Sequence, residues 1–472
     1  MMPFRMVWLW SDLLVWLLVA GVIAFIFYTR ARPHLRSPWV RVGRSASGMA
    51  AATVLSVFLL IGLLDSVHFR MALPPQDGKR VYSTQVESLL DRAVIVLRLT
   101  REKTYSAPLA THLFSKETVQ DADGTEMRVY PRLRHGGSHL SNPERDWAGD
   151  VATRAFRGLA WALLAWFVSA ITVCAVLARN AGVGMEQSWS DIWRGRKAVQ
   201  WRAILCASAF LCVMAGPLIA LAPYYHVFGT DKVGQDVLYQ ALKSIRTGLV
   251  IGTLATLVML PFALVLGVMA GYFKGMVDDS IQYLYTTLSS IPGVLLIAAA
   301  VLMMQVYIEN HAEIFPTTEI RADVRLLALC VILGITSWTG LCRLLRGETL
   351  KLRELEYIQA AHAFGVSHWR IMMRHIVPNV MHIVMIALVM DFSGLVLAEA
   401  VLSYVGVGVD PSMLSFGTMI NSARLEMARE PMVWWALAAA FAFMLALVLA
   451  ANLFADAVRD AYDPRLVVGA RT

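Results

Sequence analysis

Charged side chains are scarce in this 472-residue sequence. Asp, Glu, Lys and Arg make up 16% of the residues, hydrophobic residues make up 57%, and the mean hydropathy is +0.57. An average soluble domain is about 25% charged and about 45–50% apolar. The shortage of charge therefore excludes an ordinary soluble protein and indicates a membrane protein.

Cysteine is scarce as well, and the motifs of common enzyme sites are absent. None of the five cysteines forms a CxxC pair, which argues against a disulfide framework or a thiolate metal site. The sequence contains no GxxxxGK[ST], HExxH or GxSxG motif. We therefore predict no catalytic residue and no metal site, and any use of ATP must come from a partner chain.

Long apolar segments are what the sequence has in abundance. A hydrocarbon core needs about 20 apolar residues per helix, and backbone groups in lipid must bond internally. The first segment is interpreted as a retained helix, because no small-residue cleavage site separates it from the arginines that follow. The sequence thus predicts an all-α polytopic membrane protein with about nine transmembrane helices, at residues 7–28, 46–64, 158–178, 203–222, 247–271, 283–305, 326–344, 380–402 and 433–455.

Basic residues are concentrated in particular loops. The net charge is +8, and the loops 29–45, 179–202 and 343–375 are basic, whereas 309–323 and 410–430 are net acidic. Cytoplasmic loops collect Lys and Arg, so this pattern predicts an outside N-terminus and a cytoplasmic C-terminus. It also favours membrane lipid over nucleic acid as the partner of the positive charge.

The predicted extracytoplasmic segment 65–157 carries fourteen basic and twelve acidic side chains. It is long enough for a small domain. Its stretch 83–99 fits a helix or short strands equally well, and it contains no catalytic triad, metal-ligand spacing or phosphate loop. A small cap domain is slightly favoured over a partly ordered insertion.

The stretch QAAHAFGVSHWRIMMRHIVPN, residues 359–379, interrupts two apolar segments with a compact basic element. Good helix formers predict a helix over 357–364, with Gly365 as a left-handed C-cap. Ser367 is the expected N-cap of a second helix, and Pro378 is expected to end that helix so that the chain turns into the next span. The expected apolar stripe of this second helix consists of Trp369, Met372, Met373 and Ile376. Spacing alone leaves open whether its partner is lipid headgroups or another protein.

The same stretch resembles the cytoplasmic loop signature of ABC importer permeases. The signature reads here as Gln359-Ala360-Ala361, Gly365 and Val377-Pro378, with Gln359 in place of the usual acid. The resemblance implies a coupling helix that contacts an ATPase subunit. The residues assigned to this coupling are Glu356, which stands in for the missing acid, and Gln359, Ala360, Ala361, Gly365 and Pro378.

Four further stretches resemble the dipeptide/oligopeptide/nickel permeases. They are HVFGTDKVGQDVL (226–238), GYFKGMVDD (271–279), LAEAVLSYVGVGV (397–409) and DAVRDAYDPR (456–465). The resemblance implies a six-helix permease core at 203–465 that contains a cytoplasmic coupling loop at 343–379. The rest of the chain then divides into an extension with two transmembrane helices (1–64), the extracytoplasmic insertion (65–157), and a third helix with a cytoplasmic linker (158–202).

The function implied by this resemblance is that of a permease subunit in a bacterial plasma-membrane importer for peptides or similar small solutes. ATP-driven movement of the ATPase would be coupled to alternating access. The implied partners are a second permease in a heterodimer, two ABC ATPase subunits that bind ATP and Mg²⁺, and an extracytoplasmic substrate-binding protein. This chain itself would be no enzyme and would hold no cofactor.

Acidic side chains inside a span are functional candidates by default, and Asp391 and Glu399 lie in the eighth predicted span. The resemblance adds four residues of an outer gate or pathway, namely Gly229, Thr230, Asp231 and Asp236. Two other functions remain open from the residues. One is a proton-coupled secondary transporter using Asp391 and Glu399, and the other is a membrane-anchored sensor or assembly protein built around 65–157.

Overall fold

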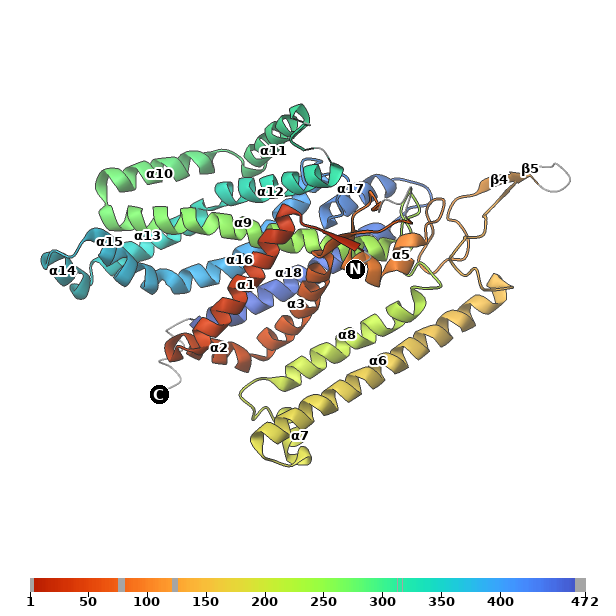
Figure 1. Cartoon of the computed structure of the whole chain (residues 1–472), viewed down its shortest axis with the longest axis horizontal. Helices are drawn as coiled ribbons and strands as arrows, with labels where there is room; N and C mark the ends of the chain where they lie inside the picture. The colour runs from red at the N-terminus through yellow and green to blue at the C-terminus, as the bar shows by residue number, and fades with distance from the viewer. Residues whose placement is uncertain (1–3, 75–80, 121–125, 312, 316, 463–472) are drawn as a thin grey trace. The chain divides into compact units, whose positions relative to one another are not determined.

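The computed structural model describes residues 4–74, 81–120, 126–311, 313–315 and 317–462, and helices dominate it (Figure 1). Within these residues, nine helical segments are long and apolar enough to cross a membrane. The predicted all-α polytopic architecture is thus confirmed. Short strands form two small antiparallel sheets, one of β1 (Phe4–Val7), β2 (His68–Met71) and β3 (Glu87–Ser88), the other of β4 (Glu117–Gln120) and β5 (Glu126–Val129).

The chain divides into two compact units. Unit 1 consists of Met1–Val7, Trp39–Thr247 and Leu414–Ala450, and unit 2 consists of Trp8–Pro38, Gly248–Met413 and Ala451–Thr472. Three helices contribute residues to both units, namely α2 (Pro33–Arg44), α9 (Val237–Phe273) and α18 (Trp435–Tyr462).

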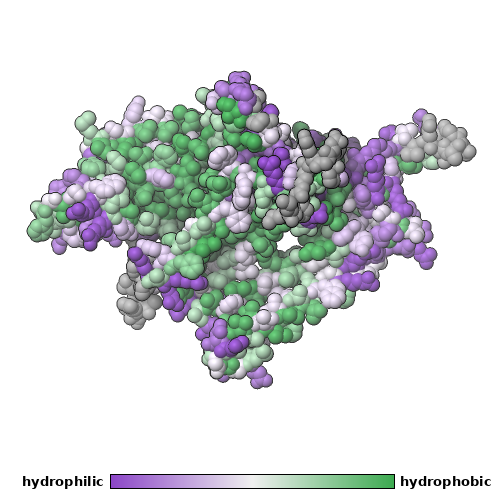
Figure 2. All heavy atoms as spheres, viewed as in Figure 1, coloured by the Kyte–Doolittle hydropathy of each residue, from purple (hydrophilic) through white to green (hydrophobic). Residues whose placement is uncertain are grey.

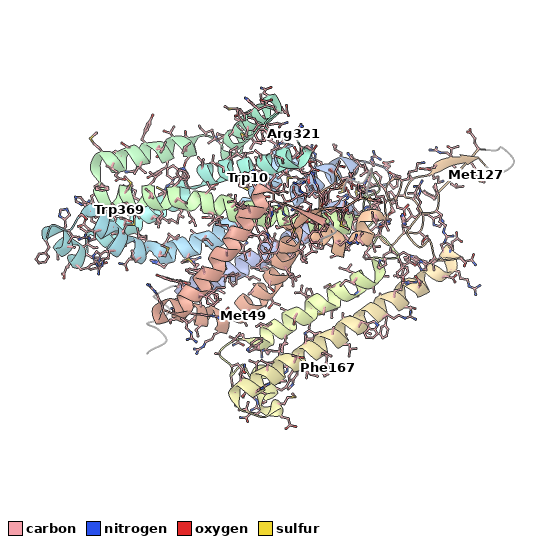
Figure 3. The ribbon with its side chains drawn as sticks, viewed as in Figure 1. Trp10, Met49, Met127, Phe167, Arg321 and Trp369 are labelled. Atoms are coloured by element: carbon pink, nitrogen blue, oxygen red, sulfur yellow. The ribbon has the colours of Figure 1, made fainter. Side chains whose placement is uncertain are left out.

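In unit 1, α6 (Pro143–Ala181) and α8 (Trp201–Leu221) run side by side (Figure 1), and α3 (Ala46–Asp65) packs on α8. Small residues permit the close approach, because a Cβ added to Gly216 would lie only 2.7 Å from the Gly158 carbonyl oxygen. The outer faces of these helices are apolar (Figure 2), and Phe167 of α6 is 52% exposed (Figure 3). Such faces suit contact with lipid.

The insertion between α3 and α6 contains both helices and strands, so both alternatives for 83–99 are present. After β3 follow α4 (Leu89–Ala93) and α5 (Ile95–Leu99). A capping box starts α4, in which the Asp91 N–H donates to Ser88 Oγ at 3.0 Å and the Ser88 N–H donates to Asp91 Oδ2 at 2.9 Å. The predicted third span, 158–178, lies within α6, which already begins at Pro143.

Unit 2 is built around two hydrophobic clusters. One joins Leu326, Leu329 and Leu333 of α12 (Thr318–Ser337) to Ile251 of α9, and α1 (Trp10–Arg30) packs on α12. The other joins α13 (Thr339–Arg353) to α16 (Val377–Tyr404). The remaining helices are α10 (Gly275–Ser290), α11 (Gly293–Asn310), α14 (Glu356–Ala363) and α15 (His368–Ile371) in unit 2, and α7 (Met185–Trp193) and α17 (Phe416–Glu426) in unit 1.

The predicted span 283–305 is wrong in its bounds. The helix breaks after Ser290, and the segment able to cross the membrane is Gly293–Asn310. Ile291 is extended, with ψ 132°, because the residue before a proline avoids the helical region, and Pro292 has no N–H to donate. The run of apolar residues continues across this break and conceals it in the sequence.

The expected end of a helix at Pro378 is also wrong. The chain is helical from His368 to Tyr404, and a π-helical turn, Met372–Ile376, ends two residues before Pro378. A proline inside an α-helix clashes with the carbonyl four residues earlier, and a π-turn is one way to relieve that clash. The wider turn also changes which side chains are buried. Ile371, Met372 and Ile376 are buried, whereas Trp369 and Met373 of the expected stripe are exposed.

Candidate functional site

Helix α14 is closed at its C-terminus by Gly365, as the sequence predicts. Gly365 has φ +73°, in the left-handed region that favours glycine. Its N–H donates to the His362 carbonyl at 3.0 Å, and the Val366 N–H donates to the Ala361 carbonyl at 3.1 Å. This pair of bonds is a Schellman motif, which satisfies carbonyls that a helix end leaves free. The reversal after α14 is therefore fixed by backbone geometry.

One face of α14 is anchored in unit 2 and the other is open. Ile358 is 2% exposed and joins the cluster that contains Ile371 and Ile376. The coupling candidates Glu356, Gln359, Ala360, Gly365 and Pro378 are exposed, and Ala361 is half-buried.

Two aromatic side chains stand out from this site, Trp369 of the expected apolar stripe and Phe364, which the sequence analysis did not single out. Phe364 is 87% exposed, and Trp369, seen in Figure 3, is 65% exposed. Aromatic residues this exposed at the tip of a helical loop are typical of a protein interface. In the sequence, the position of Phe364 directly before the capping glycine could have marked it as a contact residue.

Gln359 borders a pocket of about 290 Å³ beside α14. Its Nε2 donates to the Glu354 carbonyl at 3.2 Å, and the Glu354 side chain pairs with Lys274 at 2.8 Å. Lys274 lowers the pKa of Glu354, which keeps that carboxylate charged. The pocket is lined by Tyr272, Phe273, Arg353, Glu354, Ile358, Gln359, His362 and His368. A negative charge absent at Gln359 is thus present five residues earlier, on Glu354.

In unit 1, the loop 226–236, which the sequence predicts to lie at the outer side and which we call the outer loop, is covered by a segment of the insertion, residues 102–106. The Glu102 N–H donates to the Gly234 carbonyl at 2.9 Å, and the Thr230 N–H donates to the Ser106 carbonyl at 3.1 Å. Gly229 and Gly234 have φ +70° and +71°, and a Cβ on Gly229 would lie 2.9 Å from Trp435 Nε1. Both glycines are needed for the turn and for the close approach of the insertion.

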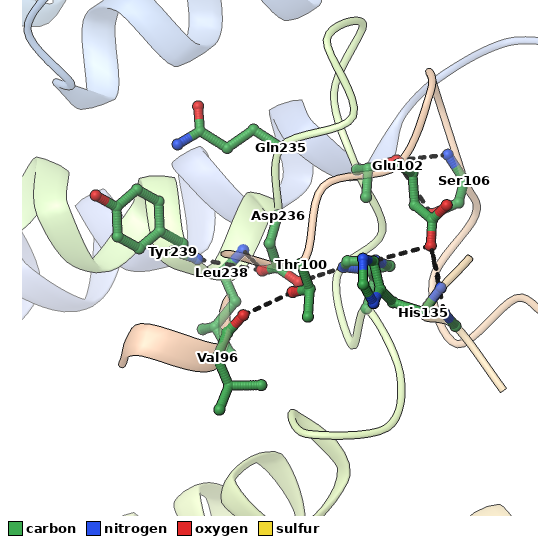
Figure 4. Close-up of polar contacts among 12 residues, drawn as sticks. Val96, Thr100, Glu102, Ser106, His135, Gln235, Asp236, Leu238 and Tyr239 are labelled. Atoms are coloured by element: carbon green, nitrogen blue, oxygen red, sulfur yellow. Dashed lines mark hydrogen bonds and ion pairs between the residues drawn. The ribbon is translucent and has the colours of Figure 1, made fainter. Parts of the chain in front are cut away.

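A buried charge cluster joins the insertion to this loop (Figure 4). His226 Nδ1 lies 2.7 Å from Asp236 Oδ2, and His226 Nε2 lies 3.5 Å from Glu102 Oε1. Glu102 also accepts the backbone N–H groups of Arg134 and His135 at 2.9 and 2.8 Å. All three charged side chains are at most 3% exposed. We call Glu102, His226 and Asp236 the outer clamp.

The outer clamp holds its charges in fixed states. Burial by itself lowers the pKa of His226, but the Asp236 and Glu102 carboxylates outweigh it and raise that pKa to about 9. Burial raises the pKa of Glu102, but the ion pair with His226 and hydrogen bonds from three backbone N–H groups lower it to about 2. A protonated histidine between two carboxylates is therefore the form present at neutral pH.

The other predicted outer-gate residues of unit 1 have structural contacts. Thr230 is fully buried; its hydroxyl donates to the Thr104 carbonyl at 2.9 Å and its carbonyl accepts the Trp435 indole at 2.9 Å. Asp231 accepts the Gln235 N–H at 2.8 Å, and Asp236 caps α9 by accepting the Leu238 N–H at 2.8 Å. These residues shape the loop and the start of α9.

A second polar group ties the insertion to α9. Lys243 Nζ donates to Asp65 Oδ1 at 2.6 Å and to Asp91 Oδ2 at 3.2 Å. The Tyr239 hydroxyl donates to Asp91 Oδ1 at 2.8 Å. The sequence did not single out Glu102, Asp65 or Asp91 for this role, because their charged partners His226 and Lys243 lie more than a hundred residues away.

Asp391 and Glu399 both lie on α16 in unit 2, whereas the four other gate candidates lie in unit 1. Glu399 is 1% exposed and accepts the Ser403 hydroxyl at 2.6 Å, one turn along its own helix. Asp391 is half-buried. A buried acid that is hydrogen-bonded within its helix fits a structural role for Glu399.

Comparison with known proteins gives a consistent result. Residues 263–468 match the family model described as binding-protein-dependent transport system inner membrane component. The glutathione transport system permease protein GsiD of Pectobacterium atrosepticum is 33% identical over 241 residues, which is 51% of this chain and 73% of that protein. The oligopeptide transport system permease protein OppC of Mycobacterium tuberculosis is 31% identical over 287 residues, which is 57% of this chain and 91% of that protein. OppC of Haemophilus influenzae is 30% identical over 51% of this chain and 71% of its own length.

Proposed function

The chain belongs to the family of binding-protein-dependent transport system inner membrane components, and we propose that it is the permease subunit of an ATP-driven importer for peptides or similar small solutes. Membership makes it a multi-pass inner-membrane transport subunit rather than an enzyme. The proposed substrate class rests on relatives named for oligopeptides and glutathione. The observation that carries the proposed mechanism is the exposed α14 with its fixed reversal at Gly365.

Coupling in this proposal takes place at α14. Two ABC ATPase subunits bind ATP and Mg²⁺, and one of them receives α14 through Phe364, Gln359 and Ala360. Because Ile358 fixes α14 to the cluster that contains Ile371 and Ile376, a displacement of α14 is passed to α16. ATP then drives alternating access because the ATPase pair binds the inward-facing and outward-facing permease with different affinity.

Two further partners complete the assembly. A second permease subunit supplies the other half of the pathway, in a heterodimer, and an extracytoplasmic substrate-binding protein delivers the solute. The basic loop of α14 then lies in the cytoplasm, which places the N-terminus outside and the C-terminus inside. In this orientation the outer clamp lies on the side from which the solute enters.

Transport by the reconstituted complex tests the proposal. The complete complex in proteoliposomes, with binding protein and a mixed peptide pool, is expected to accumulate peptide when ATP is present on the ATPase side. A proton gradient without ATP is expected to give no uptake. Uptake that follows the proton gradient and ignores ATP would instead identify a proton-coupled transporter using Asp391 and Glu399, an alternative that the homologues do not favour.

A further inference from the structure

Two basic segments that are far apart in the sequence meet in unit 1. The end of α2 and the linker before α8 are joined where the Gln200 N–H donates to the Gly43 carbonyl at 2.8 Å. The packing of α3 on α8 holds this junction, because α3 begins just after α2 and α8 begins just after Gln200. Gly43 therefore lies against residues 198–200.

The junction gathers positive charge. Segments 39–44 and 185–202 contain six basic and two acidic side chains. Asp191 lies 3.8 Å from Arg196, and the Arg196 side chain remains 65% exposed. Arg41 Nε is shielded from solvent and has no hydrogen-bond acceptor among the described residues. The basic side chains, which we call the basic junction, are Arg41, Arg44, Arg194, Arg196, Lys197 and Arg202.

Helix α7, which directly precedes the basic linker, carries two tryptophans, Trp189 and Trp193. Helix α7 connects the ends of the two candidate spans α6 and α8, with Ile192 buried on them and Trp189 packed beside it. Trp193 is 40% exposed at the end of α7, and Met185 at its start is 51% exposed. A short amphipathic helix with exposed apolar side chains at the ends of two spans is typical of the membrane–water interface.

We propose that the basic junction binds the headgroup of an anionic phospholipid. Arginine matches phosphate with two parallel N–H donors, and two adjoining segments with six basic against two acidic side chains attract an anion. The exposed apolar faces of α6 and α8 extend from the helix ends that α7 connects, and they provide a surface for acyl chains. A free soluble anion would use the charges but not these faces, which is why a lipid is the occupant that fits.

This inference goes beyond the general preference of basic loops for the cytoplasm, which needs no bound lipid. It requires selective retention of an anionic lipid through the purification of the protein. It also does not depend on the transported solute, so it stands or falls separately from the proposed function. Lipid retention and the effect of lipid on the unfolding midpoint can both be measured on the intact chain.

Native mass spectrometry of the detergent-purified complex tests the proposal. We expect retained phosphatidylglycerol or cardiolipin in excess of phosphatidylethanolamine. In the variant Arg41→Gln/Arg44→Gln/Arg202→Gln, the fraction of protein that carries anionic lipid should fall at least about fivefold, since a bidentate contact to phosphate is worth about tenfold or more in affinity. The matched control removes three exposed arginines of unit 1 elsewhere, as Arg92→Gln/Arg128→Gln/Arg145→Gln, and should retain the lipid.

Equal lipid retention by both variants would overturn the proposal. Loss of an ATPase subunit from the basic-junction variant with unchanged lipid retention would also overturn it, because that result would indicate a protein partner. A second measurement, on wild-type protein, tests the proposal even if the triple variant does not fold. Adding phosphatidylglycerol to delipidated wild-type protein should raise the unfolding midpoint, whereas phosphatidylethanolamine and soluble glycerol phosphate should not. No selective rise with phosphatidylglycerol would contradict the proposal without any variant.

Discussion

Buried charge in unit 1 centres on His226, which links the outer loop to the insertion. An ionised side chain removed from water is stable only when its charge is compensated, and Asp236 and Glu102 provide that compensation. Removing one member of the outer clamp leaves the others buried and unbalanced. The residues of the clamp are therefore expected to depend on one another more strongly than their distances alone suggest.

The outer clamp predicts a specific dependence of stability on pH. The pKa of His226 is about 9 in the folded protein and 6.5 in the unfolded chain. Its contribution to the free energy of unfolding is therefore fully present below pH 6.5 and is lost as the pH rises through about 9. The contribution at stake is of the order of 3 kcal/mol. Thermal unfolding followed between pH 6 and 10 should show this loss in the wild type.

The variant His226→Gln is the comparison for that experiment. It should be less stable than the wild type at pH 6.5, and the difference between the two should shrink as the pH approaches 10. Parallel curves for the two proteins over the whole range would rule out a charged histidine in the clamp.

Phe364 leads to a second prediction, on the interface at α14. Truncating an interface aromatic commonly costs 2 kcal/mol or more, about thirtyfold in affinity. Phe364→Ala should therefore weaken co-purification of the ATPase subunits, while the permease itself keeps its unfolding temperature because Phe364 packs on little. Phe210→Ala, on the 63% exposed Phe210 of α8, is the matched control and should keep the ATPase. Full ATPase retention by both variants would remove Phe364 from the interface.

Helix pairs in this chain depend on glycine at particular positions, and α6 shows this within one helix. A Cβ on Gly158 would overlap the backbone of α8 at Gly216, whereas a Cβ on Gly149 of the same helix would meet nothing within 4 Å. Gly158→Ala should cost about 1–3 kcal/mol, because it forces the two helices apart. Gly149→Ala should be neutral or stabilise by up to about 1 kcal/mol, since alanine is the better helix former.

Unfolding temperatures of the two glycine variants in the same detergent provide the measurement. The expected order places Gly158→Ala below the wild type and Gly149→Ala at or above it. Equal effects would show that α6 and α8 do not pack closely in the folded protein.

Helix positions and the loop at α14 could be predicted from the sequence because their determinants are local. Apolar length marks a span, and the alanines before Gly365 mark a short helix and its end. The π-turn before Pro378 and the break at Pro292 could not be predicted in the same way. A proline permits a turn, a break or a widened helix. At Pro378, the packing of Ile371 and Ile376 in the core of unit 2 favours the widened helix. The partners of His226 and Lys243 are set by tertiary contacts alone.

For the molecule as a whole, the insertion and the start of the permease-like core belong to one folded unit. The insertion supplies Glu102 to His226, and Asp91 to Lys243, while α3 and α6 pack on α8. A chain lacking residues 1–200 would expose the packed side of α8 and leave His226 and Lys243 with fewer carboxylates. We therefore predict that this truncated chain fails to give a monodisperse complex with its ATPase subunits, as judged by size-exclusion chromatography.

The β4–β5 hairpin offers the matched control for that deletion. Among the described residues, β4 and β5 pair only with each other, and Met127 on β5 is 53% exposed (Figure 3). Replacing 117–129 by a short Gly–Ser linker removes part of the insertion but none of the clamp, and flexible linkers are tolerated at such positions. The hairpin variant should assemble normally. Normal assembly and transport by the chain without residues 1–200 would show instead that the extension is dispensable and that the outer loop keeps its structure without Glu102.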